Sequence, residues 1–186
     1  INWQARLSGN QNVSEMVSTL SVLLNASLDR SEQHLVPLRE ELSIVDAYFY
    51  FVGLQFGNRL TVLRNVDEAL LDTPLPRLVV QTLIENAIEH GIAPAGGGQI
   101  QLNVFRQGEQ LVIEILNSGK PLTHDQLTAL RAMLDDRQPA DGHLDVRNVH
   151  QRLRLIFGGN AGLTFDVDTH GNTVATIREP LNPADG

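Results

Sequence analysis

The chain has 186 residues and a formal net charge of −8, because 22 acidic residues outnumber 14 basic ones. A chain of this length can form one core domain with an appendage, but not two full enzymatic domains. The excess of acidic residues, without any basic stripe, argues against nucleic-acid binding. No apolar run approaches the ~20 residues that a membrane span needs. The lack of cysteine fits a cytoplasmic location.

The first part of the chain shows helical periodicity. Residues 1–9 have no N-cap before them, so we interpret them as the end of a helix that begins upstream in a longer chain. A second helix is predicted to end near Leu28, and a third to begin at Leu38, directly after Pro37.

This third helix carries apolar residues around almost its whole circumference. Leu42, Val45 and Phe49 recur at helical spacing, and Tyr48 and Phe51 broaden the stripe. A surface this apolar requires a partner. Two explanations stay open, burial against the following domain and dimerisation through a helical bundle.

Strand patterns begin after Gly57, where Leu60 and Val62 alternate with polar residues. Apolar residues also alternate in 100–104 and 111–115, which predicts a hairpin with one buried face. Further elements are predicted in order: a flexible link at 94–98, a helix at 123–134, a loop at 135–144, a helix at 146–157, a second hairpin at 163–167 and 173–177, and a frayed tail after Pro180. Together these elements predict an α+β sandwich, with a helix layer on one mixed sheet.

The stretch Leu78–Gly91 reads L-V-V-Q-T-L-I-E-N-A-I-E-H-G and has the apolar spacing of a helix. Asn86 and His90 are four residues apart, so they project from one face of that helix. An amide oxygen is a hard ligand that suits Mg²⁺, and a histidine one turn later can reach a phosphate. The alternative is that Asn86 only bonds to nearby backbone.

This stretch resembles the N-box of the GHKL ATPase superfamily, in the form found in LytS/YesM-type sensor histidine kinases. Four other motifs resemble that family in the same order: V-P-L-R-E-E-L at 36–42, Q-F-G-N-R-L at 55–60, V-R-N-V-H-Q-R-L-R-L-I-F-G at 146–158 and G-N-T-V at 171–174. The resemblance implies a Bergerat-type ATP-binding domain in residues 58–186. Residues 1–57 would then be a helical dimerisation and connector segment, truncated at its N-terminus.

The resemblance also implies a function, the catalytic and ATP-binding part of a two-component sensor histidine kinase. Such a protein uses ATP and Mg²⁺, transfers the γ-phosphoryl group to a histidine, and relays it to a response regulator. It forms a homodimer, and the full-length protein is anchored in the membrane with its kinase part in the cytoplasm. The phosphoacceptor is expected upstream, because none of six histidines has the acceptor context: His34, His90, His124, His143, His150 and His170.

The family pattern assigns ATP binding to eight residues of this chain, with Asn86 also the metal ligand. They are Asn86, His90, Asn117, Gly119, Asp145, Arg147, Asn148 and Thr173. The chain's lone lysine, Lys120, lies next to this set in the sequence.

Two of these residues depart from the family pattern. Asn117 stands in N-S-G where D-x-G is usual, so a hydrogen bond from the adenine amino group loses charge assistance, and we expect weaker and less selective purine binding. The alternative is that Asn117 only supports a turn. Asp145 stands in H-L-D-V-R-N-V where glycine is usual, and a carboxylate at a helix N-terminus can take the place of phosphate and repel ATP. These departures keep an alternative function open, a nucleotide-poor kinase-like interaction module.

Thr82 bears on the reaction class. Gyrase-like members of the superfamily place a glutamate four residues before the N-box asparagine to activate water, and here that position is Thr82. The sequence therefore favours phosphoryl transfer to a side chain, where catalysis is positioning and charge neutralisation.

Overall fold

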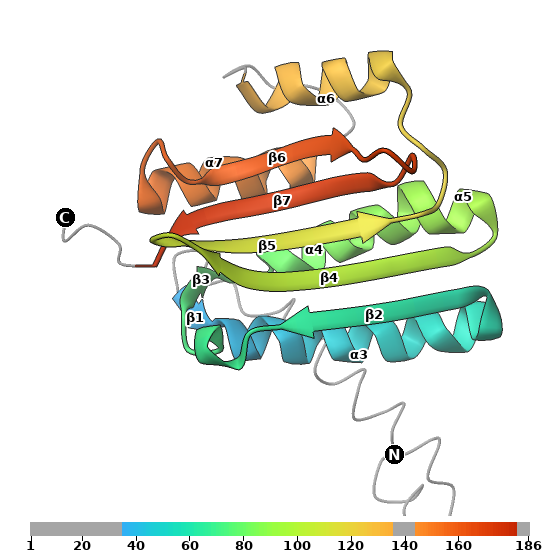
Figure 1. Ribbon diagram of the computed structural model, residues 1–186, viewed down its shortest axis with the longest axis horizontal. Helices are drawn as coiled ribbons and strands as arrows, with labels where there is room; N and C mark the ends of the chain where they lie inside the picture. Colours follow the sequence, from blue (N-terminus) through green and yellow to red (C-terminus); the bar gives the residue numbers. More distant parts are fainter. Residues whose placement is uncertain (1–34, 136–143, 182–186) are drawn as a thin grey trace, which may run out of the picture.

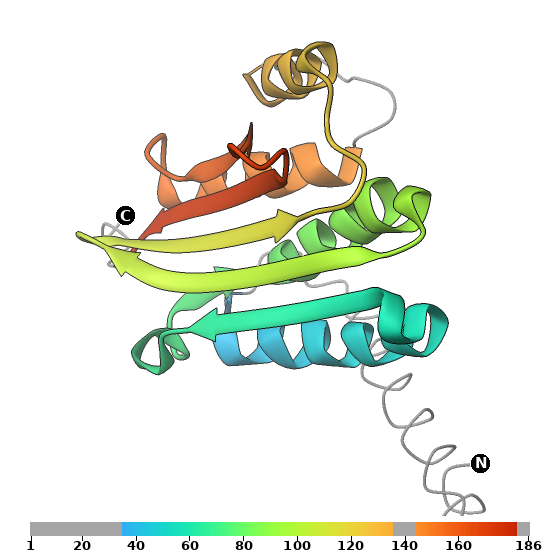
Figure 2. The same ribbon diagram turned by 45° about the vertical axis from the view of Figure 1, so that its right-hand side comes forward.

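The computed structural model describes residues 35–135 and 144–181. Its centre is a five-stranded sheet in the order β2-β4-β5-β7-β6. Strand β2 runs parallel to β4, and the other neighbours are antiparallel. Helices α3, α4 and α7 cover one face of the sheet, as Figure 1 and the turned view in Figure 2 both show. The predicted α+β sandwich with a mixed sheet is confirmed.

The strands follow the alternation in the sequence. Their bounds are β2 Leu60–Val66, β4 Gly98–Gln107, β5 Gln110–Asn117, β6 Gly162–Val167 and β7 Thr173–Pro180. In the first hairpin Leu102 pairs with Ile115 and Val104 with Ile113, and all four side chains are buried. Both predicted hairpins are confirmed, because one buried face per strand fixes the register.

Helix α3 (Leu38–Phe56) begins directly after Pro37, as predicted. Its residues Leu38, Val45 and Phe56 belong to the same hydrophobic core as the sheet, so residues before and after the expected boundary at 57/58 pack together. The opposite side of the helix is less covered, since Leu54 is 56% exposed. Burial against the sheet domain therefore accounts for one face of this apolar helix.

Short elements connect α3 to the sheet and to the next helix. They are β1 (Leu35–Pro37), which pairs with β3 (Pro74–Pro76), and two 3-10 turns, η1 (Gly57–Arg59) and η2 (Glu68–Leu70). Backbone hydrogen bonds from Leu38 N to Thr73 O (2.9 Å) and from Arg39 N to Leu71 O (3.0 Å) attach the start of α3 to the segment before α4.

Helix α4 (Val79–Asn86) continues without a break into a π-helical turn, η3 (Ala87–Ile92), and a short α5 (Ala93–Ala95). The predicted helix at 78–91 is confirmed and extends further than expected. Pro94, which we expected in a flexible link, lies in the short helix α5. Gly96 ends the helix with a φ of 76°, a conformation that favours glycine.

The start of α4 is held by a buried carboxylate. Leu78 has a φ of 65°, the one positive φ of a non-glycine residue in the described ranges. Leu78 N and Val80 N both donate to the Glu41 carboxylate, the latter at 2.9 Å. Burial raises the pKa of Glu41, and these backbone hydrogen bonds oppose the rise. Glu41 of α3 thus fixes the first turn of the helix that carries Asn86.

Two further helices complete the described structure. Helix α6 (His124–Asp135) starts with a reciprocal capping box, in which Gln126 N donates to Thr123 Oγ1 and Thr123 N to Gln126 Oε1. Helix α7 (Leu144–Phe157) begins two residues before the predicted start. The loop predicted between them lies largely outside the described residues, as do the first two predicted helices and the tail.

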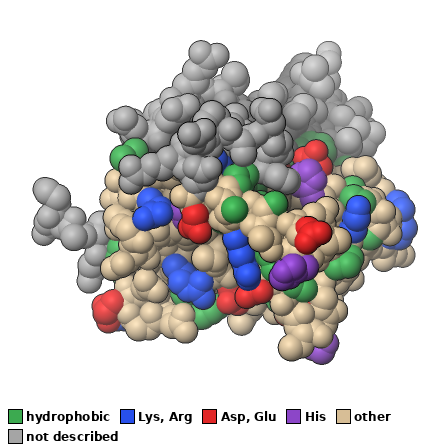
Figure 3. Space-filling view, turned by 90° about the horizontal axis from the view of Figure 1, so that it is seen from above, with side chains coloured by type: hydrophobic (Ala, Val, Ile, Leu, Met, Phe, Trp, Pro, Cys, Tyr) green, Lys and Arg blue, Asp and Glu red, His purple; other side chains and the backbone are tan. Residues whose placement is uncertain are grey.

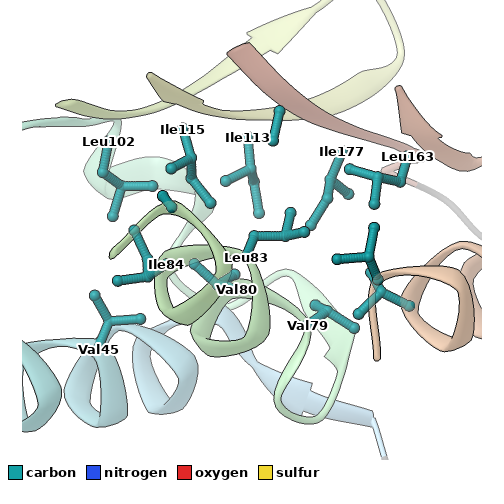
Figure 4. Close-up of a cluster of buried hydrophobic side chains, with 14 of the residues drawn as sticks. Val45, Val79, Val80, Leu83, Ile84, Leu102, Ile113, Ile115, Leu163 and Ile177 are labelled. Atoms are coloured by element: carbon teal, nitrogen blue, oxygen red, sulfur yellow. The ribbon is translucent and has the colours of Figure 1, made fainter. Parts of the chain in front are cut away.

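Helix α4 packs its apolar stripe against the middle of the sheet. Figure 4 shows Leu83 beneath Ile113 and Ile177 of the sheet, and Ile84 between Leu102 and Val45. Each of these side chains is at most 1% exposed. The burial of this stripe fixes the rotation of α4, and it turns the neighbouring Asn86 toward the ends of β5 and β7.

Candidate functional site

A cavity of about 530 Å³ opens between α4, the π-turn, α6 and the ends of β5 and β7. Most of its lining is apolar: Leu83, Ala87, Ile115, Leu130, Met133, Phe165 and Ala175 among others. Polar side chains stand at a few points, as is usual for sites that bind and orient a small organic molecule. The apolar walls suit an aromatic ring.

Four of the eight predicted ATP-binding residues line this cavity: Asn86, His90, Asn117 and Thr173. They come from distant parts of the chain, with Asn86 and Thr173 as the extremes. Asn86 and His90 share one side of the helical segment, as their spacing predicts. Lys120 also lines the cavity and is exposed, so a positive charge stands at its opening.

Asn86 stands where α4 changes into the π-turn, so the next residues follow a wider helix. Such turns occur frequently at functional sites. Within the described structure, the side chain of Asn86 makes no hydrogen bond to the nearby backbone. The interpretation of Asn86 as a backbone-bonding residue therefore finds no support in the geometry.

Gly91 and Gly119 lie in close contact beside the cavity. A Cβ on Gly119 would lie 2.2 Å from the carbonyl carbon and oxygen of Gly91, and a Cβ on Gly91 would lie 2.1 Å from Asn117 Nδ2. Lys120 N donates to Gly91 O at 2.8 Å and locks the π-turn onto the end of β5. Sequence reasoning assigned Gly119 to ATP binding and missed Gly91, although it closes the E-H-G end of the N-box pattern.

Asn117 is only 5% exposed and is the last residue of β5. The turn after it is held by Ser118, whose N donates to Gln99 O and whose Oγ accepts from Gln99 N. In the part of the chain that the structure describes, the Asn117 amide has no hydrogen-bonding partner. Asn117 therefore does not support the turn, and its polar atoms are available to the cavity.

The other three predicted residues stand apart from the cavity lining. Asp145, Arg147 and Asn148 lie near the start of α7, where Asp145 and Asn148 are exposed and Arg147 is 5% exposed. The segment that leads into this helix is outside the described residues. The structure thus brings together the N-box and strand residues but not the α7 residues.

Two glutamates of the N-box helix face away from the cavity. Burial, together with the negative charges of Glu85 and Glu89, raises the pKa of Tyr48 on α3 to about 12, so both carboxylates lie toward α3. Glu85 also accepts a hydrogen bond of 2.7 Å from Gln81 Nε2. Neither glutamate lines the cavity, and Thr82 donates to Leu78 O at 2.6 Å. Among the described residues that line the cavity, none is a carboxylate that would activate water.

The polar side chains that line the cavity fit a metal ion whose other ligands come mainly from a bound phosphate group. Within residues 35–135 and 144–181, no group of three or more His, Asp or Glu side chains forms a metal site. Asn86 offers one hard oxygen ligand at the cavity, which suits Mg²⁺ because that ion usually keeps several waters and binds substrate phosphates. Figure 3 shows basic, acidic and histidine side chains interspersed on one face of the molecule.

Comparison with known proteins agrees with this architecture. Residues 1–60 match the family model described as histidine kinase. The catalytic domain of histidine kinase ThkA superposes with a TM-score of 0.60 at 14% identity, over 80% of this chain and 97% of that domain. Acinetobacter baumannii histidine kinase AdeS superposes with a TM-score of 0.55 at 18% identity, over 96% of this chain and 82% of that one. The fold is that of a histidine kinase catalytic domain.

The curated relatives that match this chain include sensor kinases of the LytS type. The sensor histidine kinase/phosphatase LytS of Staphylococcus aureus is 29% identical over 161 residues, which is 86% of this chain and 27% of LytS. The chain is thus similar to the LytS-type sensor histidine kinases, and the resemblance seen in the motifs is confirmed. The chain spans about a quarter of the length of the curated relatives that it matches.

Proposed function

We propose that this chain is the catalytic and ATP-binding part of a two-component sensor histidine kinase. The observation that carries the proposal is the convergence of Asn86, His90, Asn117 and Thr173 on one largely apolar cavity. A purine ring fits against Ile115 and Ala175, with its polar edge toward Asn117. The phosphates then extend toward the opening, where His90 and Lys120 stand.

The residues of the cavity bind and orient the nucleotide, and none of them becomes covalently modified. A bound Mg²⁺ would supply charge neutralisation at the phosphates, with Asn86 as its protein ligand. In the transfer step, an imidazole nitrogen of the acceptor histidine forms a bond to the γ-phosphorus. The bond from that phosphorus to the β,γ-bridging oxygen breaks, and ADP leaves with its electron pair. The acceptor histidine lies upstream of this sequence, in the same chain or in a partner subunit.

Partners follow from the same proposal. Residues 1–57 would carry the homodimer contact, with α3 as the helix that joins it to the catalytic domain, and residues 58–186 would form that domain. Histidine kinase ThkA has been solved in complex with a response regulator protein, and we propose that a response regulator also receives the phosphoryl group here. We place this part of the protein on the cytoplasmic side of a membrane-anchored sensor. The helices in the described ranges contain no segment long and apolar enough to cross a membrane.

The proposal predicts that Asn86→Ala weakens nucleotide binding in the presence of Mg²⁺ by at least about tenfold, the scale of loss seen when metal sites are altered. The melting temperature of the ligand-free protein should hardly change, because this half-buried side chain makes no hydrogen bond in the described structure. Calorimetric titration with a non-hydrolysable ATP analogue, with Mg²⁺ and with chelator, measures the effect. Asn65→Ala, an exposed asparagine on β2, is the control.

Three outcomes separate the proposals. Magnesium-dependent binding that Asn86→Ala removes supports the kinase function. Unchanged binding with a large drop in melting temperature assigns Asn86 a structural role. A wild-type protein that binds no ATP analogue at all refutes the kinase proposal and favours the nucleotide-poor interaction module.

Asp145, which lies outside the cavity lining at the start of α7, gives a second prediction about nucleotide binding. It is exposed in the first turn of α7, where a carboxylate competes with phosphate for the free N–H groups and the positive end of the helix dipole. Asp145→Gly should therefore tighten ATP binding about tenfold, which corresponds to ~1.4 kcal/mol. Adenosine, which has no phosphate, should gain less.

Calorimetry with ATP and adenosine on both proteins decides this prediction. Asp125→Gly removes the same charge from the first turn of α6 and serves as the matched control. Equal ATP affinity in the wild-type protein and in Asp145→Gly would mean that Asp145 stays away from the phosphates.

A further inference from the structure

Two polar side chains stand side by side on the floor of the cavity. Asn117 ends β5 and Thr173 begins β7, and the two residues are directly paired in the antiparallel ladder. They are 5% and 9% exposed, and both line the cavity. Their same-face neighbours two positions along the strands, Ile115 and Ala175, are apolar. A ligand that enters the cavity therefore meets one polar pair on an otherwise apolar floor.

Neither member of this pair has a fixed hydrogen-bonding direction. A primary amide carries both donors and an acceptor, and a hydroxyl group both donates and accepts. In the described structure no protein group bonds to the Asn117 amide or to the Thr173 hydroxyl. The amide can therefore present either end to a ligand, since oxygen and nitrogen are nearly equal in size and the missing Cβ of Gly91 leaves room for either.

We propose that this polar pair accepts 6-oxopurine as well as 6-aminopurine nucleoside triphosphates, an inference that rests on the proposed nucleotide site. With adenine, the 6-amino group donates to Asn117 Oδ1 and Asn117 Nδ2 donates to ring nitrogen N1. With hypoxanthine, Nδ2 donates to the 6-oxo group and the N1–H donates to Oδ1, after the amide turns over. Both bases make two hydrogen bonds with the same side chain.

A carboxylate at position 117 would behave differently, because an ionised carboxylate only accepts hydrogen bonds. It would keep the bond from the adenine 6-amino group and would face the 6-oxo oxygen of hypoxanthine with a second acceptor. Asn117→Asp should therefore create discrimination that the natural side chain lacks. An acceptor left facing an acceptor in a buried site corresponds to a loss of about 10- to 100-fold in affinity.

The test compares ATP with inosine triphosphate, which replaces the 6-amino group by oxygen and carries a proton on N1. Calorimetric titrations with Mg²⁺ at pH 8 should give the wild-type protein dissociation constants within about fivefold of each other. In Asn117→Asp, inosine triphosphate should bind about 10- to 100-fold more weakly than ATP. The high pH keeps the new carboxyl ionised, because a buried, protonated carboxyl would donate as the amide does.

Asn65→Asp makes the same chemical change at an exposed position of β2 and should leave the ratio of the two affinities unchanged. If Asn117→Asp does not fold, the wild-type ratio alone decides. A wild-type preference for ATP of more than about 30-fold would overturn the inference and leave the proposed kinase function intact. Binding of neither nucleotide would refute the proposed function, and this inference with it.

Discussion

Replacement of Glu179 by leucine is expected to stabilise the protein at pH 8 by about 3–5 kcal/mol. Glu179 is 0% exposed on the helix-covered face of β7, and its two carboxylate oxygens have no hydrogen-bonding partner in the described structure. Burial raises its pKa to about 9. The folded protein must therefore hold this carboxyl protonated at a pH where the unfolded chain ionises it.

The pH dependence has a definite sign. Because the folded pKa lies above the unfolded value of about 4.5, the folded state keeps its proton while the unfolded state loses it. The free energy of unfolding of the wild-type protein should then fall from pH 4.5 toward pH 9, by about 1.4 kcal/mol per unit at most. Glu179→Leu should lack this decline, so the difference between the two proteins should grow with pH across that window.

Urea denaturation at pH 5, 6.5 and 8 measures this difference. Glu114→Leu is the matched control, because Glu114 lies on β5 with its side chain on the opposite face of the sheet and is only half-buried. That change should alter stability by no more than about 0.5 kcal/mol at any pH. A gain for Glu179→Leu that does not vary with pH would mean that Glu179 is ionised in the folded protein.

The second large effect concerns the two glycines beside the cavity. Gly119→Ala is expected to lower stability by about 3 kcal/mol and to abolish nucleotide binding. Its Cβ would meet only backbone atoms, the carbonyl carbon and oxygen of Gly91 at 2.2 Å and Ile92 N at 2.7 Å. These backbone atoms can move away only if the π-turn separates from β5. That separation breaks the hydrogen bond from Lys120 N to Gly91 O.

Gly91→Ala is expected to remove purine binding with only a small loss of stability. Its Cβ would meet the side chain of Asn117, which can rotate away, so we expect a smaller loss of stability, about 1 kcal/mol, with a loss of purine binding. Gly53→Ala is the control, because no atom lies within 4 Å of the new Cβ and alanine favours a helix interior by about 0.5–1 kcal/mol. Thermal unfolding and ATP titration of all three variants provide the measurements. Gly119→Ala with wild-type stability would contradict the close contact.

The sequence analysis predicted the last strand over residues 173–177. The structure extends the strand to Pro180, where it pairs with Gln110 of β5. Once the strand continues, its two-residue period places Glu179 on the core face with Ala175 and Ile177. The burial of this carboxylate is thus a consequence of strand pairing, which the local pattern could not show.

The sequence by itself determined most of the described elements, their order and the resemblance to LytS-type sensor histidine kinases. Periods of 3.6 and 2 are local properties, so α3, the N-box helix and the two hairpins could be predicted from the spacing of apolar side chains. The N-box motif also named Asn86 and His90, and their spacing placed them on one side of the helix. Asn117 and Thr173 followed from resemblance to the kinase family.

Only the tertiary structure decided how these parts meet. The cavity forms because the register of β5 against β7 pairs Asn117 with Thr173, and the packing of α4 on the sheet turns Asn86 toward the same place. The π-turn, the contact of Gly91 with Gly119 and the capping of α4 by Glu41 depend on residues far apart in the chain. Such contacts have no local period, because they are fixed by packing between elements and not by the conformational preferences of neighbouring residues.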